Sequence, residues 1–239
     1  ARAAASGLRQ LSAERVRDEW FKGLRTARSV QRLVELWWEV GAAEAWIPEL
    51  VRVAGGDAAG PATPASPTHA FVGGLEQRSA VLPALAGARG AAMRRDPVLL
   101  TTLLCVGPVA VLSRLKASNA EINRAAVVLT GPQEPEGVTP LAVRRWLSAV
   151  SDAADDLSML WELRHGIAPL WEPVVRGIRE RGEPLSRKAL AVTGADLQAA
   201  GIPPGPAMGA ILDNLVSQVV DDPSLNTREV LLGRARMLQ

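Results

Sequence analysis

Residues 193–212 carry the sequence TGADLQAAGIPPGPAMGAIL, which predicts a short helix, a Gly/Pro turn and a second helix. Gly205 and Pro206 fit the N-cap and the first position of that second helix, where a backbone N–H is dispensable. Gly209 leaves the next turn without a side chain, so another backbone can approach it closely. Free N–H groups at a helix N-terminus attract anions, phosphate above all. The segment is therefore a candidate docking place for a nucleic-acid backbone.

Apolar residues recur at helical spacing along most of the chain, and no segment alternates polar and apolar residues for long. One helix is predicted over residues 11–24, with Gly23 as its terminator. Another is predicted over residues 29–40, with an apolar stripe formed by Leu33, Leu36, Trp37 and Val40. We therefore expect an all-α fold of consecutive small helical domains in an elongated arrangement.

Helix starts are marked by capping residues in the second half of the chain. Ser118 with Glu121 predicts a capping box, and Asn226 with Glu229 predicts another for the terminal helix. The predicted domains are residues 1–54, 69–178 and 179–239. A linker is predicted at 55–68, because its Gly, Pro, Ala and Ser residues bury too little surface to order themselves.

Composition restricts the class of protein. A chain of 239 residues that is 48% hydrophobic can form one large or two to three small helical units. No apolar run approaches the ~20 residues that cross a bilayer, and the N-terminus lacks the apolar core of a signal peptide. The single cysteine, Cys105, excludes an internal disulfide. These features predict a cytoplasmic protein with no membrane partner.

The charge pattern allows local binding of phosphate. The net charge is only +2, and all basic residues other than Lys22, Lys116 and Lys188 are arginines. Guanidinium forks match phosphate oxygens better than ammonium groups do, although a preference for arginine also follows from genome composition. There is no Tyr and only Phe21 and Phe71, so stacking of single-stranded RNA on aromatic rings is not expected. Any RNA would be bound through its shape and its phosphates.

The sequence offers no catalytic centre. It has no P-loop, no Asp-x-Asp motif and no Gly-rich nucleotide cradle, the features that phosphoryl transfer uses. The remaining candidates for metal ligands are two isolated histidines and two adjacent aspartate pairs: His69, His165, Asp155–Asp156 and Asp221–Asp222. Adjacent residues of a helix point about 100° apart, so we expect the aspartates to be solvated caps or turns. We expect no catalytic residue, metal ion or cofactor site in this chain.

Three motifs occur in the same order as in the C-terminal half of bacterial CCA-adding enzymes, the tRNA nucleotidyltransferases related to poly(A) polymerase. LSAERVRDEWFKGL at 11–24 resembles the neck helix of that family, and WEVGAAEAWIPEL at 38–50 resembles its continuation. DPVLLTTLL and RLKASNAE, within 96–121, resemble the body. Residues 193–212 resemble the tail. The positions that match the neck pattern are Arg15, Val16, Glu19 and Lys22.

The resemblance implies a neck-like domain at 1–54, a body-like domain at 69–178 and a tail-like domain at 179–239. Together they would grip the acceptor and TψC arms of tRNA. The implied RNA-binding residues are Arg144, Arg145, Arg179, Arg181, Arg187, Lys188, Gly205 and Gly209. The residues implied to brace the neck are Arg15, Arg17, Glu19 and Lys22. Without the resemblance, both groups of charges would be ordinary solvated helix faces, with pairs such as Arg15–Glu19.

Catalysis in the family belongs to an N-terminal head, whose Gly-Ser and Asp-x-Asp motifs bind metal ions and nucleotide. Neither motif occurs here in a suitable setting. The resemblance therefore implies that Mg²⁺, ATP and CTP bind to a head outside this chain, in cis or in trans, and that the chain alone is inactive. The chain is then a fragment, a processed product or one half of a split enzyme. The alternatives are a stand-alone helical RNA-binding or scaffolding module, and a helical protein without a role in RNA.

Overall fold

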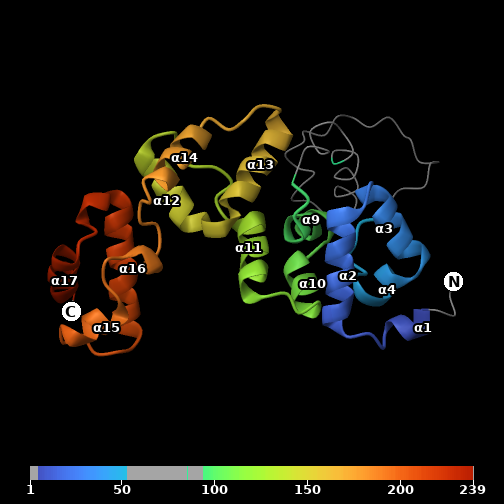
Figure 1. Cartoon of the computed structure of the whole chain (residues 1–239), viewed down its shortest axis with the longest axis horizontal. Helices are drawn as coiled ribbons and strands as arrows, with labels where there is room; N and C mark the ends of the chain where they lie inside the picture. Colours follow the sequence, from blue (N-terminus) through green and yellow to red (C-terminus); the bar gives the residue numbers. More distant parts are fainter. Residues whose placement is uncertain (1–4, 53–84, 86–93, 239) are drawn as a thin grey trace. The chain divides into compact units, whose positions relative to one another are not determined.

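The computed structural model describes residues 5–52, 85 and 94–238 (Figure 1). Within this part of the chain the prediction of an all-α fold is confirmed. The exception to helix and turn is an isolated antiparallel bridge between Leu50 and Cys105. The predicted linker at 55–68 lies outside the described residues.

The chain divides into two compact units, and each has its own core. The first consists of Ala1–Gly131 with Asp155–Ile167, and the second of Pro132–Ala154 with Ala168–Gln239. The division into neck-like, body-like and tail-like domains stays a prediction.

Helix α9 is the centre of the first unit. The helices of this unit are α1 (Ala5–Leu8), α2 (Ala13–Thr26), α3 (Val30–Glu39), α4 (Ala42–Trp46), α9 (Pro97–Leu104), α10 (Pro108–Arg114), α11 (Asn119–Thr130) and α13 (Ala154–His165). All eight side chains of α9 are buried, and the helix contacts α2, α10 and α11 (Figure 1). The buried Trp20 of α2 donates from Nε1 to Thr101 Oγ1 at 2.9 Å. Its ring meets Trp37 edge-on, with the ring centroids 4.8 Å apart.

The predicted end of α2 is wrong, because the helix passes through Gly23 and ends at Thr26. A Cβ atom at Gly23 would lie 2.9 Å from Leu33 Cδ1 of α3. The missing side chain therefore allows α3 to approach closely and does not terminate the helix.

The predicted apolar stripe of α3 is also wrong in part. Leu36 and Val40 are 45% and 42% exposed, whereas Val30 and Val34 are buried. Helix α3 packs on α2 and α4, and the face that Val30 and Val34 share is the buried one. The physical reason is that the helix is rotated relative to the stripe that spacing alone suggested.

A partly buried ion cluster links α9, α11 and α13. Asp156, only 1% exposed, accepts hydrogen bonds from Arg124 Nε at 2.6 Å and from Arg124 Nη2 at 2.5 Å. Arg124 Nη1 also donates to Asp96 at 3.1 Å. Burial raises the pKa of the Asp156 carboxyl, and the adjacent guanidinium opposes that shift. The expectation of a solvated cap or turn is therefore wrong for Asp156, since a partner 32 residues away holds it inside.

Helix α16 is the centre of the second unit. The elements of this unit are α12 (Pro140–Val150), η2 (Ser151–Ala153), α14 (Glu172–Glu180), η3 (Arg187–Ala189), α15 (Gly194–Ala199), α16 (Pro206–Asp221), η4 (Pro223–Leu225) and α17 (Arg228–Met237), where η marks a 3₁₀ helix. Helix α16 contacts α12, α15, α17 and η3. The core cluster around it consists of Leu190, Val192, Leu197, Ile202, Met208, Ile211, Leu215, Val219, Leu231 and Ala235.

Local capping signals place most helix starts correctly. The predicted capping box at Ser118 and Glu121 is confirmed. The predicted box at Asn226 and Glu229 is wrong, because Thr227 caps α17 by accepting a hydrogen bond from the Val230 N–H at 3.4 Å. The amide of Asn226 is engaged elsewhere, on the backbone beside η3.

Candidate nucleic-acid interface

The start of α16 is confirmed at Pro206, with Gly205 as its N-cap. Gly205 has φ 148° and ψ −171° and makes no side-chain capping bond to the helix. Residues 203–207 are exposed, so the first turn of this 16-residue helix faces solvent. The first N–H groups of a helix have no intrahelical acceptor and carry partial positive charge. The sequence thus produces the exposed helix start that residues 193–212 predicted.

Helix α15 precedes this start and has its own N-terminal cap. Thr193 and Asp196 form a capping box, in which the Asp196 carboxylate accepts from the Thr193 N–H at 2.8 Å. The hydrogen bonds from Thr193 lower the pKa of Asp196, and the Arg228 guanidinium adds to the shift.

The side chain of Arg187 lies across the first two turns of α16. Its Nε donates to Asp213 Oδ1 at 2.6 Å, and its Nη2 lies 2.5 Å from Asp213 Oδ2. The same Nη2 donates to the Gly209 carbonyl oxygen at 3.2 Å. A Cβ atom at Gly209 would lie 3.9 Å from Nη2, so the turn without a side chain is approached by this guanidinium. The bond from Arg187 lowers the pKa of the Asp213 carboxyl.

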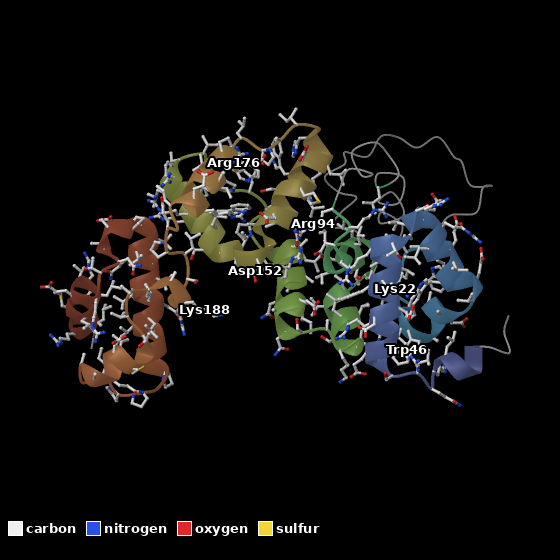
Figure 2. The ribbon with its side chains drawn as sticks, in the orientation of Figure 1. Lys22, Trp46, Arg94, Asp152, Arg176 and Lys188 are labelled. Atoms are coloured by element: carbon white, nitrogen blue, oxygen red, sulfur yellow. The ribbon has the colours of Figure 1, made fainter. Side chains whose placement is uncertain are left out.

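Lys188 follows directly and is exposed on η3, which contacts α16 (Figure 2). It forms no ion pair with any residue that the structure describes. The backbone just after it is fixed by Asn226, whose Nδ2 donates to the Ala189 carbonyl at 2.9 Å. Asn226 Oδ1 accepts from the Ala191 N–H at 2.8 Å. Arg187 therefore lies against the first two turns of α16, and Lys188 is the next residue of η3. We call Arg187, Lys188 and residues 203–209 the η3–α16 surface.

Arg144 and Arg145 lie at the other end of α16. Arg144 donates from Nε to the Val220 carbonyl at 2.6 Å and from Nη2 to the Asp221 carbonyl at 3.1 Å. Its side chain is only 12% exposed and also pairs with Glu183. Arg145 is exposed and pairs with the Asp221 carboxylate at 2.8 Å. Arg144 therefore satisfies the last two carbonyl groups of α16, whereas Arg145 pairs with the side chain of its last residue. This end of α16 is about 24 Å from its start by helix geometry.

The remaining predicted cations belong to the end of α14. Arg179 lies in its last turn and is exposed. Arg181 follows the helix, is 57% exposed and donates to Glu183 Oε1 at 2.6 Å. The predicted RNA-binding residues thus fall into three places: the η3–α16 surface, the end of α16 and the end of α14.

The residues predicted to brace the neck lie on α2. Arg17 donates to the Lys116 carbonyl at 2.6 Å and pairs with Asp18, so it links α2 to the turn after α10. Arg15, Glu19 and Lys22 are exposed on the same helix, and Figure 2 labels Lys22.

Two polar contacts of the η3–α16 surface were missed by the sequence reasoning, those of Asp213 and Asn226. Asp213 could have been found, because it follows Gly209 by one helical turn. Asn226 could not, because its position before α17 is equally typical of a cap. Of the aspartate pair Asp221–Asp222, Asp222 is a cap as expected, because its carboxylate accepts a hydrogen bond from the Ser224 N–H at 3.0 Å at the start of η4.

The described residues contain no group of three or more His, Cys, Asp or Glu side chains placed to share a metal ion. In the same residues, every helix is too short or too polar to cross a membrane.

The C-terminal part of this chain is similar to a known protein family. The family model for tRNA nucleotidyltransferase domain 2 matches residues 178–235. A CCA-adding enzyme of Levilactobacillus brevis is 51% identical over 48 residues, which are 20% of this chain and 12% of that enzyme. No solved structure matches the chain significantly. Residues 178–235, which include η3, α15, α16 and most of α17, are therefore similar to a domain of tRNA nucleotidyltransferases, in agreement with the resemblance of residues 193–212 to the tail of CCA-adding enzymes.

Proposed function

We propose that this chain is the tRNA-binding C-terminal region of a CCA-adding enzyme. The parent reaction is the addition of CCA to tRNA 3′ ends from CTP and ATP, with Mg²⁺ and both nucleotides bound in a head domain outside this chain. One observation carries the proposal: the family match over 178–235 coincides with the surface where exposed cations lie beside an open helix start.

The η3–α16 surface suits a phosphate backbone. Lys188 is exposed and forms no ion pair within the described structure, and the Arg187 side chain is 50% exposed. The first turn of α16 adds N–H groups and the positive end of the helix dipole. Contacts of this kind recognise phosphate positions and not bases, which suits an enzyme that serves every tRNA.

The other predicted cations have supporting positions in this proposal. Arg145, Arg179 and Arg181 are exposed elsewhere on the same unit, where they would offer further phosphate contacts. Arg144 is nearly buried and bonded to the end of α16, so its contribution is to hold that helix in place.

The test is the affinity of the full chain for a tRNA transcript, measured over a series of salt concentrations. We expect Lys188→Ala to weaken binding and to make the slope of log affinity against log salt shallower by about 0.9. Lys22→Ala is the matched control, because Lys22 is also an exposed lysine but lies on α2 of the other unit. Absence of binding by the wild-type chain at low salt would overturn the proposal.

A competition experiment distinguishes tRNA binding from a general attraction to polyanions. A DNA hairpin of equal length carries the same charge but lacks the A-form shape and the 2′-hydroxyl groups. We expect it to compete weakly. Equal competition by the DNA hairpin would contradict a tRNA-specific role.

A further inference from the structure

The Arg187 guanidinium is occupied in the free chain by a carboxylate of the same surface. The two carboxylate oxygens of Asp213 bind the Nε and Nη2 atoms of Arg187, at 2.6 Å and 2.5 Å. Nη2 donates in addition to the Gly209 carbonyl. A phosphate bound to Arg187 would need the same two donors, because a guanidinium binds carboxylate and phosphate oxygens with the same bidentate geometry.

We propose that Asp213 competes with tRNA phosphate for Arg187 and thereby sets the affinity of the η3–α16 surface. This inference rests on the proposed function. In the free chain the carboxylate neutralises Arg187, and in the complex a phosphate oxygen replaces it on Nε and Nη2. Lys188 contributes to binding from the start, whereas Arg187 contributes only after the exchange.

The exchange is physically easy because both partners are exposed. The Arg187 and Asp213 side chains retain 50% and 66% of their accessible surface. Exposed ion pairs are weak, since water screens them and both side chains lose freedom when they pair. The bond from Nη2 to the Gly209 carbonyl does not involve Asp213. It keeps the guanidinium over α16 when the carboxylate leaves, so the cation stays beside the helix start.

Position distinguishes Arg187 from Arg145, which also pairs with an exposed aspartate but lies at the other end of α16 and outside residues 178–235. Arg144 has a side chain that is 12% exposed and is bonded to two backbone carbonyls, so no ligand can replace its partners without uncovering the end of α16. Arg187 has an exposed carboxylate as its main partner. It also lies within the segment that matches the family model.

A double-mutant cycle on the full chain tests the competition, with the tRNA transcript as the probe. We expect Asp213→Asn to bind about twofold to fivefold more tightly than wild type, the range expected when an exposed ion pair no longer opposes binding. The gain should disappear when Arg187→Ala is also present. Circular dichroism verifies that each variant retains its helices.

The cycle separates competition from a simple loss of negative charge. An equal gain from Asp213→Asn with and without Arg187 would mean that only charge matters, and would overturn the inference. Weaker binding of Asp213→Asn would show that the carboxylate orients Arg187, which also overturns it. Glu229→Gln removes an exposed carboxylate of α17 and should leave the affinity unchanged. If wild type binds tRNA and the cycle fails, only this inference is lost; if wild type does not bind, the proposed function fails with it.

Discussion

Two glycines of the η3–α16 surface have opposite requirements, although they are four residues apart. Gly205 has φ 148° and ψ −171°, a region that only glycine adopts readily, and a Cβ atom there would meet nothing within 4 Å. Gly209 lies inside α16, where a Cβ atom would make an ordinary contact of 3.9 Å with Arg187 Nη2. The effect of an alanine on stability should therefore depend on backbone strain at Gly205 and on helix propensity at Gly209.

We expect Gly205→Ala to lower the free energy of unfolding by about 1–3 kcal/mol, because alanine would be strained at this φ and ψ. Gly209→Ala should raise it by up to about 1 kcal/mol, because alanine favours the helix. Urea denaturation of the two variants measures both effects, and each variant is the control for the other. Changes of the same sign would contradict this assignment of strain.

Individual residues also show which features the local sequence determines: it places helix starts, but not the partners of polar side chains. Gly205–Pro206 and Ser118 place helix starts correctly, because a cap depends on residues three or four positions away. Asp156 was expected in solvent, yet Arg124 of another helix holds it inside. Asn226 was expected to cap α17, yet it binds the backbone beside η3. In both errors the deciding partner is more than 30 residues distant in the sequence.

At the scale of the element, α9 shows how a helix without a polar face becomes the centre of a unit. Every one of its side chains is buried, so its two threonines need acceptors inside the protein. Thr101 donates to the Pro97 carbonyl at 2.6 Å and accepts from Trp20 Nε1. A hydroxyl of α9 therefore satisfies the indole N–H of α2.

We expect Thr101→Val to destabilise the protein by about 1–3 kcal/mol, because it leaves the buried Trp20 N–H without an acceptor. Thr101→Ser is the matched variant, since it keeps the hydroxyl and loses only a methyl group, at a cost of about 0.8 kcal/mol. Guanidinium denaturation gives both values. A valine variant as stable as the serine variant would show that the hydrogen bond contributes little.

Helix α3 shows that the spacing of apolar residues predicts a helix better than it predicts the buried face of that helix. Spacing correctly predicted a helix over nearly the observed residues, but two of the four residues assigned to its apolar stripe are largely exposed. A stripe shows that a helix is amphipathic, whereas the exact buried face depends on which neighbours the helix meets. Gly23 illustrates the same point, because its role appears only when Leu33 of α3 is placed against it.

At the scale of the whole molecule, the all-α class followed from composition and pattern, but the grouping of the helices did not. The first unit joins Asp155–Ile167 to residues far earlier in the chain. The Arg124–Asp156 pair is one of the contacts that make this connection. For the η3–α16 surface, local sequence correctly placed the helix start at Gly205, but it did not predict that Asp213 pairs with Arg187. Cations can be counted in a sequence, whereas their neutralisation depends on the packing of α16.

The second unit carries four carboxylates whose pKa values are lowered in the folded state. A side-chain hydrogen bond is the main cause in each case, from Thr193 to Asp196, from Arg187 to Asp213, from Arg145 to Asp221 and from Ser224 to Asp222. An unfolded aspartate has a pKa of about 3.9. These groups therefore stabilise the folded state above that pH, and the stabilisation is lost as the pH falls through their lower folded values.

We expect the thermal midpoint to be nearly constant between about pH 7 and pH 5, and to fall steeply below about pH 4. Asp196→Asn should lower the midpoint near neutral pH, because the bonds from Thr193 and Arg228 to a carboxylate are weakened. At the acid end of the titration the variant and the wild type should converge, since Asp196 is then protonated in both states of the wild type. Thermal melts followed by circular dichroism give both curves. A constant difference between them at every pH would mean that the Asp196 charge does not contribute and that the cap acts through its geometry alone.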